Sequence, residues 1–144
     1  MSIKRIHRRF ALSLPALGLG ALTSGLPAVQ AEAPTVYYVN VANLGARFPY
    51  TSWEHAASNI QDAVSAGTEP GRLVLVTNGV YRGGMVDDYG LSRAALTDVV
   101  LRSVNGAAVT TIDGGAVARC VTLRSNARII GFTLTNGFAW EGGG

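Results

Sequence analysis

The sequence predicts an all-β protein, a β-solenoid that opens with one α-helix. The first observation is that apolar, β-branched runs end three times in Asn-Gly, at 78–79, 105–106 and 136–137. Successive asparagines are 27 and 31 residues apart, and such uneven spacing suits coils that keep their strands while their corner loops vary in length. The second observation is that helical periodicity occurs in one early segment. Hairpins at Asn-Gly would need longer return strands, so an antiparallel sandwich is the less favoured alternative.

Residues 1–31 are predicted to be a secretory signal peptide. A basic start with Lys4 precedes an apolar stretch rich in small residues, and Val29-Gln30-Ala31 supplies the small residues that precede a cleavage site. Cleavage is expected between Ala31 and Glu32. The alternative, a membrane anchor, is disfavoured because prolines and glycines interrupt a short, weakly apolar stretch. The protein is therefore expected to be secreted, whether extracellular, periplasmic or on the cell surface, by the general or the twin-arginine route.

The charge that remains after cleavage argues against two classes of partner. Residues 32–144 contain eight arginines, no lysine and nine acidic residues, a formal charge of −1. The positive charge of the whole chain therefore belongs to the leader, and nucleic acid is not an expected partner. No membrane partner is expected once the leader is removed. The single cysteine, Cys120, cannot form an internal disulfide, and 113 residues suit one domain.

The mature chain is expected to begin with a strand at 36–41 and a loop at 43–50. Thr51-Ser52-Trp53-Glu54 then matches the capping box that starts a helix, and this helix should end at Gly67. Its polar face would carry His55. The apolar stripe, at helical spacing, consists of Trp53, Ala56, Ala57, Ile60, Ala63 and Val64.

From Arg72 onward the pattern changes to short strands separated by Gly, Asn, Asp and Ser. Strands are expected at 73–77, 99–103, 109–112, 120–123 and 129–135. Arg102, Thr122 and Thr133 should point away from the core. Alternation along the strands predicts apolar faces made of Val74, Val76, Val99, Leu101, Val121, Leu123, Ile130, Phe132 and Leu134.

Four motifs, in this order, resemble the right-handed parallel β-helix proteins of the pectin-lyase-like superfamily. They are the helical segment 59–64, the strand and Gly-x-Tyr phrase at 73–81, Ile-Asp-Gly at 112–114 and Gly-Phe-Thr-Leu at 131–134. The resemblance implies that the helix closes the N-terminal mouth of the solenoid. It also implies that Asn78 and Asn136 lie at tight corners, where asparagines of successive coils stack. Residues 32–144 would then hold the N-terminal cap and the first coils, truncated at the C-terminal end.

The superfamily contains polysaccharide lyases and hydrolases, and also secreted proteins with no known chemistry. A lyase site of this type implies several carboxylates that hold Ca²⁺ and an arginine that removes a proton. The nearest match is Asp87-Asp88 with Arg93 in one loop, but calcium needs six to eight oxygens, so a solvated loop between coils is the simpler interpretation. Tyr89 and Trp140 are weak candidates for stacking on sugars. No catalytic residue or metal site is identifiable from the sequence, and calcium rests on the resemblance alone.

Four other residues are interpreted as structural. Asp113 belongs to the Ile-Asp-Gly corner and is expected to be a turn residue, and Tyr81 should pack at a corner. His55 has no Ser, Cys or second His placed to make a triad or a metal site. Cys120 is interpreted as a packed, inert thiol.

Two functions are compatible with these residues. One is a secreted polysaccharide-active enzyme, lyase or hydrolase, whose groove lies outside them. The other is a non-catalytic surface, adhesion or glycan-binding module. Polysaccharide is the expected partner in the first case and in the glycan-binding form of the second. An uncapped last coil at 129–135 would leave apolar side chains and backbone groups open, so self-association is expected when these residues are expressed alone.

Overall fold

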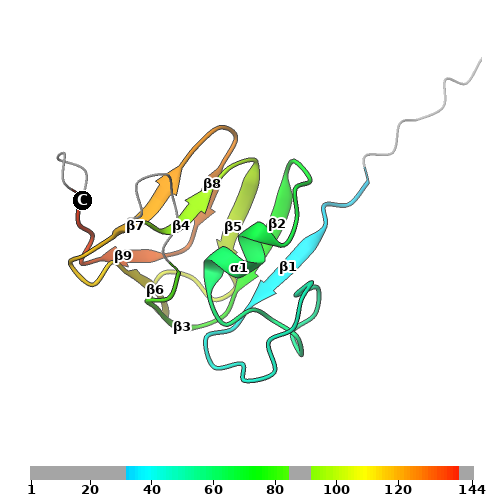
Figure 1. Cartoon of the computed structure of the whole chain (residues 1–144), viewed down its shortest axis with the longest axis horizontal. Helices are drawn as coiled ribbons and strands as arrows, with labels where there is room; N and C mark the ends of the chain where they lie inside the picture. Colours follow the sequence, from blue (N-terminus) through cyan, green and yellow to red (C-terminus); the bar gives the residue numbers. More distant parts are fainter. Residues whose placement is uncertain (1–31, 85–91, 140–144) are drawn as a thin grey trace, which may run out of the picture. The chain divides into compact units, whose positions relative to one another are not determined.

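The computed structural model describes residues 32–84 and 92–139, and within them most regular structure is β-strand (Figure 1). The one helix of the described residues, α1 (Ile60–Ser65), comes early, after the first strand. The strands are β1 (Val36–Val39), β2 (Arg72–Val76), β3 (Gly79–Tyr81), β4 (Ser92–Leu96), β5 (Val99–Ser103), β6 (Thr110–Asp113), β7 (Arg119–Leu123), β8 (Arg128–Ile130) and β9 (Thr133–Thr135).

The strands form three sheets in which every pairing is parallel. Sheet A has the order β1-β2-β5-β8, sheet B the order β3-β6-β9, and sheet C pairs β4 with β7. From β2 onward the chain visits sheets A, B and C in turn and then repeats, and we call one such passage a circuit. The strands that flank Asn78 lie in different sheets, so neither a hairpin there nor an antiparallel sandwich describes this part of the chain.

Alternate residues of the sheet A strands face the core. Tyr37, Val74, Leu101 and Ile129 are successive register partners, and the first three are buried. A slip of one residue would turn each inward side chain to solvent, at a cost of roughly 1.5–3 kcal/mol for each large apolar residue. The predicted core positions that are fully buried are Val74, Val76, Val99 and Leu101.

The predicted strand at 129–135 is wrong. Gly131 has a φ of 77°, a left-handed conformation that favours glycine, and it separates β8 in sheet A from β9 in sheet B. Ile130 therefore faces outward and is 47% exposed. Leu134 does continue an inward row, beyond Ile112, yet it is half-exposed because no described strand follows it. Leu123 is also half-exposed rather than buried.

The predicted start of the helix is wrong as well. Helix α1 begins at Ile60, where the Asn59 side chain accepts a hydrogen bond of 2.9 Å from the Asp62 N–H. The preceding residues are held by the sheet instead, because Ala57 bridges in parallel to Val39. The Ser52 hydroxyl accepts from the His55 N–H at 3.3 Å, which closes one turn but starts no helix. The stripe residues Ala56, Ala57, Ile60, Ala63 and Val64 are buried, whereas Trp53 is exposed.

The N-terminal edge of the sheets is covered. The Tyr38 N–H donates to the Tyr50 carbonyl at 2.8 Å, and the Asn40 N–H donates to the Ala57 carbonyl at 2.8 Å. Gln61 of α1 accepts from the Ala95 N–H of β4 at 2.9 Å. Helix and loop thus satisfy backbone groups that an open edge would leave exposed. Over residues 32–84 and 92–139, no helix is long and apolar enough to cross a membrane.

Three hydrogen bonds between side chains join successive circuits at the corners. In each, an asparagine amide N–H donates to a side-chain oxygen one circuit earlier, 23 to 28 residues away. Asn78 does lie at a corner, between β2 and β3, and Asn105 repeats it between β5 and β6. The expectation that Asn136 continues this series is wrong, because Asn136 follows β9 of sheet B, at another corner, with a φ of 51° that asparagine tolerates. The bonds are Asn105 to Asn78 at 2.7 Å, Asn126 to Asp98 at 2.8 Å and Asn136 to Asp113 at 3.0 Å.

Candidate functional site

The corner between sheets B and C gathers polar side chains from successive circuits. Strands β3, β6 and β9 of sheet B end here, and the chain continues from β3 to β4 and from β6 to β7 of sheet C. Arg82 follows β3, Asp113 ends β6, and Asn136 follows β9, while Arg93 lies near the start of β4. The parallel stacking of the strands brings these residues together although they span 55 positions of the chain.

Asp113 is the central residue of this corner. Its Oδ2 accepts from Arg82 Nε at 2.8 Å, and its Oδ1 accepts from Asn136 Nδ2 at 3.0 Å and from the Gly115 N–H at 2.9 Å. The hydrogen bonds from Asn136 and Gly115, with the smaller contribution of Arg82, hold the pKa of Asp113 below its usual value, and burial opposes them only in part. The bond from the Gly115 N–H closes the turn that follows β6, so the interpretation of Asp113 as a turn residue is confirmed. The bonds from Arg82 and Asn136 join this turn to the circuits before and after it.

Arg93 ties the same corner together through its guanidinium group. Nη2 donates to the Gly114 carbonyl at 3.0 Å, Nε to the Asp113 carbonyl at 3.3 Å, and Nη1 to the Gly84 carbonyl at 3.5 Å. The residue lies in strand β4, not in a loop as the sequence suggested. Its donors bind backbone carbonyls of one connection before it, at Gly84, and of one after it, at Asp113 and Gly114, which is a structural role. The other weak candidates, Asp87, Asp88, Tyr89 and Trp140, lie outside the described residues.

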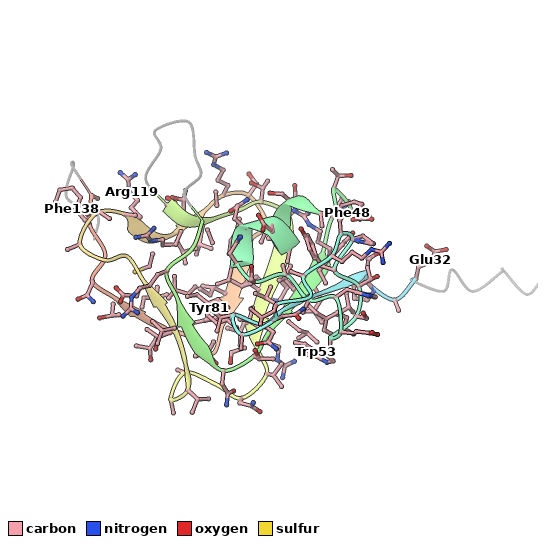
Figure 2. All side chains as sticks on the ribbon, turned by 60° about the horizontal axis from the view of Figure 1, so that its bottom comes forward. Glu32, Phe48, Trp53, Tyr81, Arg119 and Phe138 are labelled. Atoms are coloured by element: carbon pink, nitrogen blue, oxygen red, sulfur yellow. The ribbon has the colours of Figure 1, made fainter. Side chains whose placement is uncertain are left out.

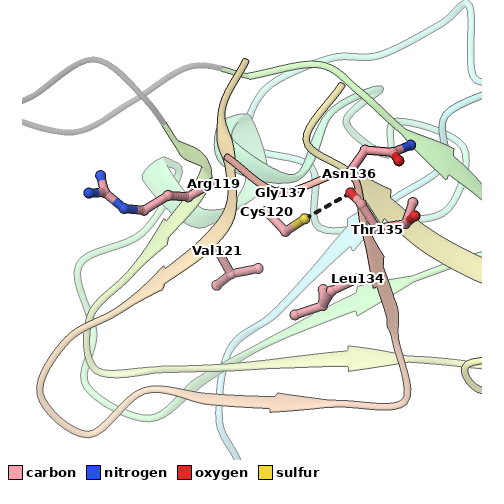
Figure 3. A pocket seen from close by; sticks show the side chains of 7 residues that line it. All are labelled: Arg119, Cys120, Val121, Leu134, Thr135, Asn136 and Gly137. Atoms are coloured by element: carbon pink, nitrogen blue, oxygen red, sulfur yellow. Dashed lines mark hydrogen bonds between the residues drawn. The ribbon is translucent and has the colours of Figure 1, made fainter. Parts of the chain in front are cut away.

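A pocket of about 160 Å³ lies beside this corner, between β7 and β9 (Figure 3). Its apolar part comes from Val121 and Leu134, and Figure 3 shows the Arg119 side chain directed away from it. Cys120 donates its Sγ–H to the Thr135 carbonyl at 3.1 Å and is 7% exposed, in keeping with a packed thiol. The lining residues are Arg119, Cys120, Val121, Leu134, Thr135, Asn136 and Gly137, none of which is a carboxylate.

Two further candidates have structural positions. His55 lies in the loop before α1 rather than on a helix face, and its Nδ1 is 3.3 Å from Ser52 Oγ within the same turn. Tyr81 is buried, and its hydroxyl donates to the Thr77 carbonyl at 3.0 Å. Burial raises the pKa of Tyr81. The expectation that Tyr81 packs at a corner is therefore confirmed.

The described carboxylates do not fit a calcium ion. Calcium takes six to eight oxygen ligands, whereas the oxygens of Asp113 already accept from N–H donors. Within 32–84 and 92–139, no three His, Cys, Asp or Glu side chains are close enough to share a metal ion. The side chains of this corner bind the backbone of the connections and one another, and the described residues there include no pair placed to act as acid and base.

Known proteins do not identify this chain. No protein-family model, no curated protein and no solved structure matches it.

Sequence reasoning missed that an aromatic pair and two arginines lie on or beside the outer face of sheet A. Tyr38 and Trp53 lie with ring centroids 4.5 Å apart and an interplanar angle of 61°, although the sequence placed Trp53 on a buried helical stripe. Arg102 points outward, as predicted, and Arg128 is exposed on the same face. The register that places these residues on one face cannot be read from the alternation of any single strand.

Proposed function

We propose that the chain is the N-terminal part of a secreted, right-handed parallel β-helix of the pectin-lyase-like kind, from a protein that acts on polysaccharide. The observation that carries this proposal is the repeated order of sheets A, B and C, all with parallel pairing. A chain that revisits three sheets in a constant order stacks each circuit on the one before, as a solenoid does.

The corners support the same proposal. The Asn105 to Asn78 hydrogen bond joins equivalent corners one circuit apart, and it is the kind of asparagine stacking that the family resemblance implies. The Asn136 to Asp113 and Asn126 to Asp98 bonds do the same at the other two corners. Because side chains and strands repeat together, the circuits share one architecture. Helix α1 then serves as the N-terminal cap, tied to sheet C through Gln61.

Secretion is part of the proposal and rests on the sequence of residues 1–31. If the signal is removed as expected, the secreted protein begins at Glu32, which N-terminal sequencing would reveal. Recovery of an intact species that starts at Met1 in the soluble fraction would contradict this.

A non-catalytic glycan-binding module is the second candidate. It is favoured by the way in which Asp113 and Arg93 are used, since the hydrogen bonds of both residues hold the corner. An arginine or aspartate so engaged is poorly placed to move a proton on a substrate. The two candidates share a ligand class and differ in whether the polymer is cut.

One experiment separates them. The secreted protein is incubated with acidic and neutral polysaccharides, and the products are followed by ultraviolet absorbance of unsaturated ends and by reducing ends. Unsaturated ends indicate a lyase, and reducing ends alone indicate a hydrolase. Binding without cleavage indicates the module. A protein that neither binds nor cleaves any polysaccharide would refute the proposed function.

A further inference from the structure

Three Asn-Gly pairs lie at exposed corners of the circuits. The side chains of Asn78, Asn105 and Asn136 are all exposed, and each takes part in one of the corner hydrogen bonds. Asn-Gly is chemically reactive, because glycine has no side chain to keep its backbone nitrogen away from the preceding side-chain amide. Since all three side chains are similarly exposed and similarly bonded, a difference in reactivity must come from the N–H of the following glycine.

Two of these glycine N–H groups are held by acceptors. The Gly79 N–H, in strand β3, donates to the Val109 carbonyl at 2.9 Å, and the Gly106 N–H donates to Ser103 Oγ at 3.0 Å. An N–H in a hydrogen bond gives up its proton only after that bond opens, as amide hydrogen exchange shows. The fold therefore protects the first two Asn-Gly pairs from attack by their own backbone.

The third pair, Asn136-Gly137, lacks this protection. No acceptor among residues 32–84 and 92–139 takes the Gly137 N–H. Gly137 is half-buried and lines the pocket of about 160 Å³ together with Thr135 (Figure 3), and a space of this size with polar lining admits water. Figure 2 shows the next residue, Phe138, at the outside of the protein. The nitrogen of Gly137 is thus open to hydroxide without any unfolding.

We propose that Asn136-Gly137 is a site of spontaneous deamidation in the folded protein. Hydroxide removes the Gly137 N–H proton, and the nitrogen attacks the Asn136 side-chain carbonyl carbon. A new C–N bond forms, the bond from that carbon to Nδ2 breaks, and ammonia leaves with a proton from water, which restores hydroxide. Water then opens the cyclic imide at either carbonyl and leaves aspartate or isoaspartate at position 136. The reaction consumes only water and is independent of the proposed polysaccharide ligand.

Either product would break the corner at which it forms. Asn136 Nδ2 donates to Asp113 Oδ1 at 3.0 Å, and a carboxylate in place of the amide would set two negative charges against each other. Isoaspartate also adds an atom to the main chain, next to Gly114, where even an added Cβ would come within 2.9 Å of the Gly137 Cα. The Ala116 N–H holds the same segment by donating to the Asn136 carbonyl at 2.8 Å. Deamidation should therefore loosen β9 from the turn that follows β6.

The test compares the three asparagines within one protein. Trypsin places them in separate peptides, 73–82, 103–119 and 129–144, none of which contains another Asn or Gln. The folded secreted protein is incubated at mildly alkaline pH, deamidation of each peptide is followed by mass spectrometry, and the protein unfolded in urea is the reference. Breaking one hydrogen bond slows attack by up to about tenfold, so Asn136 should react up to about tenfold faster than Asn105. Asn78, whose glycine lies within sheet B, should react more slowly still, and in urea the three rates should converge.

Two kinds of variant check the cause and the consequence. Ser103→Ala removes the acceptor of the Gly106 N–H, so it should raise the rate at Asn105 by up to about tenfold in a protein that thermal melting shows to be folded. The rate at Asn136 should not change. Asn136→Asp should melt at a lower temperature than Asn136→Ala at neutral pH, because only the first adds a charge beside Asp113, and this difference should disappear in acid.

Four results would overturn the inference. Equal rates at the three asparagines in the folded protein, or a faster rate at Asn78 or Asn105, would remove the proposed site. Slowing of Asn136 by folding to the same extent as the other two would do the same. An unchanged rate at Asn105 in folded Ser103→Ala would remove the role of the glycine N–H. Wild-type stability of Asn136→Asp at neutral pH would contradict the predicted damage to the corner.

Discussion

Leu101→Ala tests the inward row of sheet A. Leu101 is fully buried in the central strand β5, between Val74 and Ile129. The substitution removes three carbon groups, about 2.4 kcal/mol at roughly 0.8 kcal/mol each. The cavity left between two packed neighbours raises the expected loss of unfolding free energy to about 3–4 kcal/mol. For a domain of this size that corresponds to a fall in Tm of roughly 10–20 °C.

The matched control is Leu123→Ala, the same substitution at a residue that is 52% exposed. It lies at the end of β7 and buries about half as much surface, so its loss should be about 1 kcal/mol or less. Both variants are measured by urea unfolding, with circular dichroism and Trp fluorescence as independent probes. Equal losses in the two variants, or a larger loss at Leu123, would refute the assignment of Leu101 to the closed core and of Leu123 to the half-exposed edge strand β7.

Three further predictions concern a corner, its charge and the last strands. Gly114→Ala should lower the free energy of unfolding by about 1–3 kcal/mol, because an added Cβ would collide with the carbonyl oxygens of Ala118 and Asn136. The control Gly45→Ala should be near neutral, since its Cβ would come no closer than 3.5 Å to Asn43 Oδ1. Equal stabilities of the two variants would contradict this prediction. The pKa of Asp113 is lower in the folded state, so the stabilising contribution of its carboxylate is complete above the unfolded pKa of about 3.9 and is lost as pH falls through the folded pKa. Asp113→Asn should therefore lower the free energy of unfolding at pH 7 and lower it much less in strong acid. An equal loss at both pH values would refute this prediction. The strands β7, β8 and β9 each have a described neighbour on one side only, and Leu134 is half-exposed, so residues 32–144 should self-associate at micromolar concentration in equilibrium sedimentation; a cooperatively melting monomer would contradict this.

The sequence predicted strands well where side chains alternate clearly. Val74, Val76, Val99 and Leu101 are buried as expected, because their β-branched and apolar alternation matches one buried face. It missed β3, which has three residues, and β4, whose Ser-Arg-Ala-Ala-Leu has no strong strand propensity. Both strands are defined by their neighbours in other circuits, β6 and β7.

The helix start failed for a tertiary reason. A capping-box pattern at 51–54 is local, but the sheet edge pairs with Ala57 through a bridge and backbone hydrogen bonds, which keeps the residues before α1 out of a helix. The prediction of one continuous strand through Gly131 failed for a similar reason, since nothing in the local sequence distinguishes a glycine within a strand from one that bends the chain into another sheet.

Which residues meet in the candidate sites depends on the register between strands that are far apart in the sequence. Sequence reasoning identified Asp113 as a turn residue and Arg102 as outward-facing, but it could not place Asn136 against Asp113 or Arg128 beside Arg102. Those neighbours are 23 and 26 residues apart. The length of each corner loop decides which residues meet, and alternation within a strand does not specify that length.

The stacking of circuits is tested most directly by disulfide cross-linking in a Cys120→Ser background. Leu75 pairs with Arg102 in sheet A and Val80 with Thr111 in sheet B, so cysteines at either pair would lie about 4.8 Å apart, within disulfide reach. We predict that both pairs oxidise within one chain, as peptide mass spectrometry would show. Cysteines at Leu75 and Val104, two residues out of register and roughly 8 Å apart, should not. Cross-linking of the out-of-register pair, with neither register pair linked, would contradict the parallel stacking on which the proposed β-helix depends.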